Sequence, residues 1–236
     1  MTVEQRYISK ELTHFIGKAL EDDNQRYELL INILKSCLLT YKPGVSASSR
    51  HLSITPSASF INGGMYNQSC VCFCDIPLED IAIHIIKYGP FGISFLKSSR
   101  PMRAATPVFY VANESALTAS KKRNRAEYFT RGIKAWHTFK AALREGHTNP
   151  KILELSNEFI VAESFIEGAI LSFLKPFNNT LPENDTDNYY MEREWRVLGI
   201  VKFALNDVHR VILPSGYATR FRNDLPVYTG QLSFSD

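Results

Sequence analysis

The sequence predicts an α+β fold in which a mixed sheet of short strands carries an inserted block of helices. Apolar segments with strand character lie toward both ends of the chain, whereas residues 115–175 have the spacing of long helices. Strands and helices do not alternate regularly, which disfavours a doubly wound parallel sheet. With 236 residues, 44% of them hydrophobic, we expect a single domain, residues 1–236, with a helical insert at about 115–175.

The first segments are predicted to be a strand and an amphipathic helix. Residues 7–14 have strand character and end near His14. Residues 22–39 place apolar side chains at helical spacing behind two aspartates that favour a helix start, and a Pro-Gly pair follows their end. The Ser-, Asn- and Gly-rich residues 45–69 are expected to form a long irregular loop.

The next elements are predicted from a cysteine-rich segment onward. Residues 70–76 have the composition of a strand, and Pro77 both ends this strand and suits the first turn of a helix at 78–87. A Gly-Pro turn then leads to two further strands, at residues 93–96 and 107–112.

The second half of the chain is predicted to be helical first and then extended. Helices are expected over residues 115–146 and 153–174, where a Lys-Pro pair ends the second. The Asn-, Asp- and Pro-rich residues 178–190 are expected to form a loop. Three strands then follow, at residues 192–203, 208–213 and 225–228.

The basic residues are concentrated in one part of the chain. The net charge is only +3, but residues 97–144 contain eleven Lys or Arg against two Glu, a net charge of +9, so that the remainder carries −6. This polarity favours a polyanionic partner such as nucleic acid. A solvated helix face or a surface for an acidic protein is the alternative.

The cysteines and the hydropathy suggest a cytoplasmic protein. Three of the four cysteines alternate along one predicted strand, which is no disulfide framework and indicates a reducing compartment. Strand geometry would spread their sulfurs about 7 Å apart, too far to share one zinc ion, so we expect core packing and no metal. The sequence has no apolar run of about eighteen residues and no secretory signal pattern, so no membrane association is expected.

The clearest candidate site opens the predicted strand 192–203. Two carboxylates alternate there with two guanidiniums, and strand alternation would point Glu192, Glu194 and Arg196 to one face. A carboxylate fixed by a neighbouring guanidinium suits the orientation or polarisation of a substrate. The alternative is a strand-edge ion pair without a chemical role.

Several common chemistries lack their motifs. The sequence has no phosphate-cradling glycine loop, no His-Glu-x-x-His and no Gly-x-Ser-x-Gly. A metal-dependent nuclease that uses Asp75, Glu79 or Asp80 is a weaker hypothesis, because the dipole of the following helix already accounts for these acids.

Three groups of residues together resemble the AbiGi family of abortive-infection proteins from bacterial phage-defence loci. They are the Tyr-Ile-Ser-x-x-Leu-Thr-His-Phe segment at 7–15, residues 74–110 around Tyr-Gly-Pro-Phe-Gly-Ile-Ser-Phe, and Glu-Arg-Glu-Trp-Arg at 192–196. The resemblance spans most of residues 7–200, and members of the family have been labelled antitoxins.

The order of the motifs also resembles that of the DarT-type ADP-ribosyltransferases, NAD-dependent enzymes that modify nucleic acid, and that of the related CmdTAC toxin. The Thr13-His14 pair, a helix, a loop with an arginine and a late glutamate before an apolar strand carry this likeness. It implies a mainly antiparallel split sheet of the ADP-ribosyltransferase type and NAD as the substrate.

The same likeness implies catalytic roles for two glutamates. Glu194 would bind a ribose hydroxyl and stabilise the positive charge that develops as nicotinamide leaves. Glu192 could activate the acceptor.

It also implies a set of NAD-binding residues. His14, next to Thr13, would hydrogen-bond the nicotinamide-side ribose, and Arg50 would contact phosphate, with His51 and Arg100 as alternatives for this role. Either of two aromatic residues could stack on nicotinamide, and a serine could occupy the polar position on the central strand. These three residues are Tyr88, Phe91 and Ser94.

The sequence therefore predicts a cytoplasmic mono-ADP-ribosyltransferase that acts as a toxin or effector in phage defence. We expect nucleic acid as the acceptor and a cognate antitoxin or other restraining protein as a partner. The expected nucleic-acid contacts are Lys121, Lys122, Arg123, Arg125 and Arg131. The alternative is a non-catalytic antitoxin or interaction module whose basic face binds a toxin.

Overall fold

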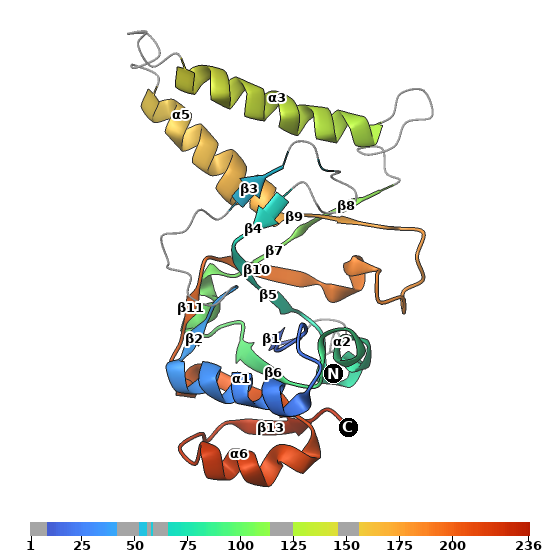
Figure 1. Ribbon diagram of the computed structural model, residues 1–236, viewed down its shortest axis with the longest axis vertical. Coiled ribbons are helices and arrows are strands. Elements are labelled where there is room, and N and C mark those ends of the chain that lie inside the picture. The colour runs from blue at the N-terminus through green and yellow to red at the C-terminus, as the bar shows by residue number, and fades with distance from the viewer. Residues whose placement is uncertain (1–8, 42–51, 56–57, 59–65, 114–124, 146–155) are drawn as a thin grey trace, which may run out of the picture.

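A seven-stranded sheet forms the centre of the computed structural model (Figure 1). The structure describes residues 9–41, 52–55, 58, 66–113, 125–145 and 156–236, without the side chains of residues 66, 125–130 and 156–158. The strand order is β13-β12-β6-β1-β5-β10-β7. The strands are β1 (Glu11–Phe15), β5 (Cys70–Cys74), β6 (Gly92–Leu96), β7 (Thr106–Pro107), β10 (Glu194–Leu198), β12 (Val208–Leu213) and β13 (Gln231–Phe234).

Neighbouring strands of this sheet are antiparallel, except that β12 and β13 are parallel. The expectation of an α+β fold with a mixed, mainly antiparallel sheet is therefore confirmed. No helix among the described residues is both long and apolar enough to cross a membrane.

The main core lies between the sheet and helix α1 (Asp23–Ser36). This helix starts at Asp22, whose carboxylate accepts from the Asn24 N–H at 3.2 Å, and it buries Tyr27, Leu30 and Leu34 against the sheet. Helix α6 (Ala218–Asp224) contributes the fully buried Phe221 to the same core. This core contains Leu12 of β1, Phe73 of β5 and Phe95 of β6.

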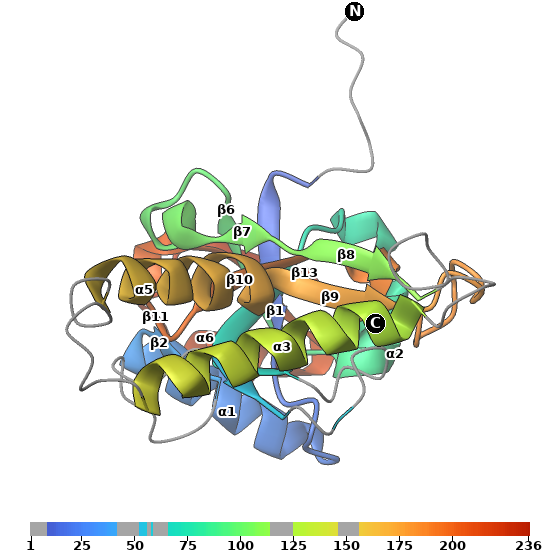
Figure 2. The same ribbon diagram turned by 90° about the horizontal axis from the view of Figure 1, so that it is seen from above.

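A helical lobe, defined here as α3, α5 and η3, lies at the end of the molecule opposite α6 (Figure 1). Its elements are α3 (Arg125–Glu145), α5 (Ser156–Glu163) and the π-helical segment η3 (Ser164–Ile170). The short helix η4 (Leu171–Phe173) then leads into β9 (Leu174–Phe177), which pairs in parallel with β8 (Phe109–Ala112). Viewed from above, α5 and β9 follow each other roughly along one line (Figure 2).

Several elements in the first half of the chain end at other residues than predicted or are divided. The first helix stops at Ser36 because Cys37 adopts a left-handed conformation (φ 52°), and β2 (Leu38–Leu39) follows. The expected loop 45–69 contains β3 (Leu52–Ile54) and β4 (Tyr66–Gln68), which pair with each other. Residues 78–87 form the short helix η1 (Leu78–Asp80) and α2 (Ala82–Tyr88).

The C-terminal half differs more. The expected strand 192–203 is interrupted at Gly199 (φ 78°), after which β11 (Val201–Lys202) pairs with β2. The segment predicted to end a helix at Lys175 is instead strand β9. Residues 225–228 do not form a strand. The last strand of the chain is instead β13, which pairs with β12. The expected strand 107–112 is divided between β7 and β8, and α6 was not expected.

Candidate functional site

Three adjacent strands bring the predicted N-terminal and C-terminal site residues together. In the antiparallel ladder Cys74 of β5 lies opposite Thr13 of β1 on one side and Glu194 of β10 on the other. Two strand spacings, roughly 10 Å, therefore separate the backbones of Thr13 and Glu194. Paired residues share a face, so Thr13, Cys74 and Glu194 lie on one face of the sheet. The next residue, His14, lies opposite Ile93 in the ladder, and its Nδ1 reaches the Cys72 carbonyl of β5.

A cavity of about 210 Å³ lies beside strands β1, β5 and β10. Of the predicted site residues, His14, Tyr88, Glu192 and Glu194 line it. The remaining lining residues are Phe15, Cys72, Phe73, Cys74 and Lys175. The structure thus gathers the two predicted catalytic acids, the histidine and one of the two candidate aromatic residues around one space.

Lys175 of β9 binds both glutamates at the edge of this cavity. Its ammonium donates to one carboxylate oxygen of Glu192 and to one of Glu194. Glu192 also accepts from the Lys87 ammonium at 2.7 Å and from the Tyr88 hydroxyl, both at its second oxygen. The two glutamate side chains are only 4% and 5% exposed.

Arg196 holds the other oxygen of Glu194. Its Nε donates to Glu194 Oε1 at 2.5 Å, and its Nη1 donates to the Ser172 carbonyl at 2.7 Å and to the Leu174 carbonyl at 3.3 Å. The guanidinium therefore joins strand β10 to the segment that carries Lys175. This arrangement fixes the orientation of the Glu194 carboxylate.

The electrostatics keep both glutamates ionised. Burial alone would raise the pKa of Glu194, but the charges and hydrogen bonds of Lys175 and Arg196 outweigh it and lower this pKa to about 2. Burial likewise opposes the ionisation of Glu192, yet Lys175, Lys87 and Tyr88 hold its pKa below the ordinary value. Glu194 is thus a permanent anion at neutral pH, which suits the stabilisation of positive charge.

His14 is held as one neutral tautomer. Its Nδ1 lies 2.7 Å from the Cys72 carbonyl, and because a carbonyl oxygen only accepts, Nδ1 carries the proton. Burial lowers the pKa of His14 below its ordinary value, although the bond to Cys72 opposes the shift. The neutral ring therefore offers Nε2 as a hydrogen-bond acceptor.

Other predicted NAD-binding residues lie away from the cavity lining. The hydroxyls of Thr13 and Ser94 form a buried hydrogen bond of 2.8 Å that joins β1 to β6. Phe91 is fully buried in the main core, where it packs against Tyr27. These three residues support the sheet around the cavity.

The predicted phosphate-contacting arginine was Arg50, which with its alternative His51 lies outside the described residues. The other alternative, Arg100, lines a separate cavity and not the one at Glu194.

The predicted nucleic-acid contacts are mostly not described. Lys121, Lys122 and Arg123 lie outside the described residues, and Arg125 begins α3 without a described side chain. Arg131 is exposed on α3.

On strand β5, the distance between two of the cysteine sulfurs differs from the predicted one. The sulfurs of Cys70 and Cys72 lie 3.7 Å apart, much closer than the expected spacing of about 7 Å, because the two side chains lean toward each other. Among the described residues there is no group of three His, Cys, Asp or Glu side chains that could hold a metal ion. Asp75, considered above for a nuclease, forms an ion pair of 2.6 Å with Lys97.

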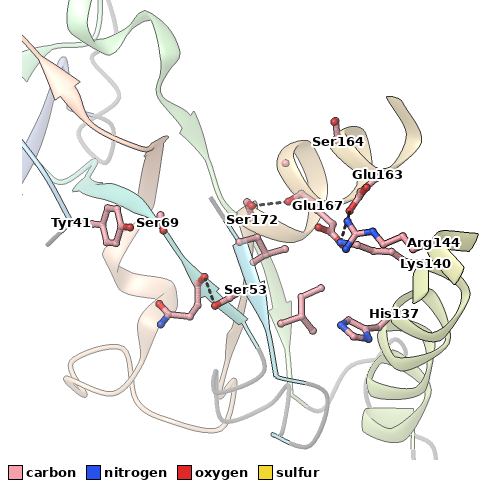
Figure 3. A pocket seen from close by; sticks show the side chains of 14 residues that line it. Tyr41, Ser53, Ser69, His137, Lys140, Arg144, Glu163, Ser164, Glu167 and Ser172 are labelled. Atoms are coloured by element: carbon pink, nitrogen blue, oxygen red, sulfur yellow. Dashed lines mark hydrogen bonds and ion pairs between the residues drawn. The ribbon is translucent and has the colours of Figure 1, made fainter. Parts of the chain in front are cut away.

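A second cavity of about 730 Å³ separates the β3–β4 pair from the helical lobe (Figure 3). Two lysine or arginine side chains from α3 meet two glutamates there: Lys140 lies 2.5 Å from Glu163 and 2.7 Å from Glu167, and Arg144 lies 2.8 Å from Glu163. These charges balance. Ser172 also lines this cavity, and its carbonyl binds Arg196 behind the glutamate site.

Lys175 and Lys87 are the site residues that sequence reasoning missed. Lys175 was interpreted only as part of a helix-ending pair, and it reaches Glu194 because β9 pairs with the distant β8. A lysine next to a proline gives no local sign of this role. Lys87 lies at the end of a predicted helix. Only its position next to Tyr88 in the sequence indicates that it belongs to the same site.

The fold and site define an α+β protein with a buried, fully ionised carboxylate–lysine cluster beside a small cavity. A family profile described as "Putative abortive phage resistance protein AbiGi, antitoxin" matches residues 65–224, more than half of the chain. The chain therefore belongs to the AbiGi family. No curated protein and no solved structure matches it.

Proposed function

We propose that this AbiGi protein is an NAD-dependent mono-ADP-ribosyltransferase that acts in abortive infection. One observation supports this most strongly: His14 and Glu194, from opposite ends of the chain, line one cavity together with Tyr88. A neutral imidazole, a permanent carboxylate and an aromatic ring are the groups needed to hold a nicotinamide riboside. The shared cavity supports the proposal, because the reaction would require these groups to contact one ligand.

The proposed reaction breaks the bond between ribose C1′ and the nicotinamide nitrogen. The electron pair of this bond leaves with nicotinamide, positive charge develops at C1′, and a nucleophile of the acceptor forms the new bond as its proton departs. Glu194 would stabilise the charged transition state, and His14 Nε2 would accept from a ribose hydroxyl. The Tyr88 ring would pack against nicotinamide.

Binding in this mode brings a third donor to Glu194. Lys175 and Arg196 each donate to one of its two oxygens, so a ribose hydroxyl would either share one of these oxygens or displace Lys175 from it. A displaced Lys175 would become available to a phosphate of NAD.

The cavity suits one end of NAD rather than the whole molecule. Its volume of about 210 Å³ is below the roughly 300–1,000 Å³ of typical ligand pockets, so the nicotinamide end would enter and the remainder would lie along the rim. The exposed Lys18, whose ammonium lies 4.8 Å from the Tyr88 ring centroid, is placed to contact the pyrophosphate there.

Labelled NAD and nucleic acid test the proposal. Transfer of label is expected with the wild-type protein, and Glu194→Gln should reduce it by about 100- to 1,000-fold, as expected when one stabilising group is removed. Glu183→Gln, a change at an exposed loop residue, is the matched control and should transfer normally. Equal transfer by wild type and Glu194→Gln would refute the catalytic assignment.

The family description supports a second candidate function, the non-catalytic antitoxin. It names an antitoxin directly, whereas no comparison names a transferase. The complete pairing of both glutamates is also compatible with a structural cluster, and a cognate toxin would then be the partner.

Expression in growing cells separates the two candidates. An enzymatic toxin should inhibit growth when it is expressed alone, and Glu194→Gln should relieve the inhibition. An antitoxin should be harmless alone and should protect cells from its partner. The net charge of +9 over residues 97–144 supports nucleic acid as the acceptor in the first case.

A further inference from the structure

Two exposed tyrosines lie directly before the glutamates and have no part in the mechanism above. Tyr189 is 38% exposed and Tyr190 is 56% exposed, although both adjoin a buried cluster of charges. They begin the short helix η5 (Tyr189–Glu192), which ends at the buried Glu192. We call this pair the aromatic platform.

The aromatic platform is held rigidly by its supports. The buried Asn188 accepts from the Tyr190 N–H at 3.3 Å and donates to the Leu181 and Pro182 carbonyls, which fixes the turn. One face of the Tyr190 ring stacks on Phe177, with centroids 5.0 Å apart and planes 29° apart. A ring that is packed from one side and yet more than half exposed presents its other side to solvent.

The platform is also connected to the catalytic glutamate. Tyr110 makes an edge contact with Tyr190 at 5.1 Å between centroids, and its hydroxyl accepts from the Glu194 backbone N–H at 2.7 Å. Tyr189 lies beneath the same lysines that bind the glutamates, with the Lys87 and Lys175 ammonium groups 4.0 and 4.8 Å from its ring centroid. A ligand on the platform would therefore lie next to the Glu192–Glu194 cluster.

We propose that the aromatic platform stacks an unpaired base of a single-stranded nucleic acid, and so selects the acceptor. This inference rests on the proposed transferase function. Exposed aromatic rings beside cationic side chains are the usual means by which proteins bind single strands, because every base has a face that can stack. Bases inside a duplex present only their edges, so a duplex would not fit this surface.

Binding of labelled oligonucleotides in the absence of NAD tests the proposal. Single-stranded DNA and RNA of about 12 nucleotides, within the usual site size, should bind more tightly than the same sequences as duplexes. Tyr190→Ala should weaken single-strand binding by about 5- to 150-fold, the loss expected for one stacked base. Tyr190→Phe should retain binding.

Further variants separate stacking from folding. Tyr190→Leu keeps an apolar side chain against Phe177 but removes the stacking face, so it should bind as weakly as Tyr190→Ala while its thermal midpoint stays near that of wild type. Tyr189→Ala should also weaken binding. Phe234→Ala, at an exposed aromatic residue on the far strand β13, is the matched control and should bind like wild type.

Three results would overturn the proposal: no single-strand binding by wild type, equal binding of single strands and duplexes, or wild-type affinity in Tyr190→Leu. Failure of the transferase proposal gives a different pattern. In that case single strands still bind through Tyr190, but no label is transferred from NAD. Transfer to a protein without any oligonucleotide binding would instead identify a protein acceptor and refute the platform.

Discussion

The glutamate cluster and the helical lobe use the same kinds of charges in different surroundings. In the cluster, Lys175 is 15% exposed and its two carboxylate partners are almost completely buried. In the lobe, Lys140 is 12% exposed, but its partners Glu163 and Glu167 are 19% and 16% exposed, and Arg144 is 44% exposed where it meets Glu163. Because solvent screens the Arg144 pair more than the cluster, the cluster holds its charges in the more fixed geometry.

The apolar surroundings differ in the same direction. The cluster lies on a sheet whose other strands enter the main core, with fully buried rings such as Phe95 and Phe221. The lobe rests on a small core around Ile133, Val111, Leu171 and Leu174, while Ile160, Val161 and Phe165 remain exposed. The site is thus attached to the more strongly packed part of the molecule, and four changes test this contrast.

Loss of the lysine that bridges the glutamates should have the largest effect. Lys175→Ala leaves two buried carboxylates short of a partner, which should lower the free energy of unfolding by about 3–5 kcal/mol in urea denaturation. Lys175→Met, which preserves most of the side-chain volume, should be similarly destabilised, because the missing charge and not a cavity is the cause. A loss below about 1 kcal/mol, the usual value for exposed pairs, would show that the cluster stabilises the fold no more than a surface ion pair does.

Acid should remove a comparable amount of stability from the cluster alone. Because folding lowers the pKa of Glu194 to about 2 from roughly 4.3 in the unfolded chain, its contribution is fully present above about pH 5 and is lost as the pH falls toward 2. The shift corresponds to about 3 kcal/mol. Urea denaturation from about pH 7 to 3 should show this decline in wild type and a smaller one in Glu194→Gln. Identical pH profiles would mean that Glu194 is not held ionised by the fold.

A cavity in the small core should act locally. Ile133→Ala should cost about 2–3 kcal/mol, the lower part of the usual range, because the lobe can relax around the missing methyl groups. Hydrogen exchange should become faster in α3 while the amides of β5 and β10 remain protected. Equal acceleration in those strands would show that lobe and sheet unfold as one unit.

Removal of an exposed charge from the lobe should have the smallest effect. Arg144→Ala should change the free energy of unfolding by about 0–1 kcal/mol, since Lys140 still neutralises Glu163 and solvent screens the lost pair. Urea denaturation in parallel with Lys175→Ala gives the comparison directly. A loss as large as that of Lys175→Ala would remove the distinction between the two regions.

Local sequence patterns predicted the strand that carries the site better than they predicted which charged side chains pair there. Alternation along β10 correctly placed Glu194 and Arg196 on one face, because that segment is a regular strand. Glu192 was expected in the same strand but lies in the helical turn η5, since Arg193 adopts a left-handed conformation (φ 44°). Its carboxylate nevertheless reaches the cluster through Lys175.

The remaining partners follow from contacts that local patterns do not encode. Lys175 depends on the parallel pairing of β8 and β9, and the support of Glu194 by Tyr110 depends on the same pairing. The early end of α1 depends on the left-handed conformation of Cys37, and a cysteine in the sequence does not by itself indicate such a conformation. The approach of His14 to Glu194 could be anticipated only from the resemblance in motif order.

The thermal midpoint, Tm, with and without NAD tests the central proposal most directly. At an NAD concentration of about 100 times the Kd, binding should stabilise the wild-type protein enough to raise its Tm by about 5–10 °C. His14→Ala, which removes the proposed ribose contact at the cavity, should lose most of this shift, whereas Phe234→Ala should keep it. A wild-type Tm that NAD leaves unchanged, or an equal rise in His14→Ala, would contradict the account.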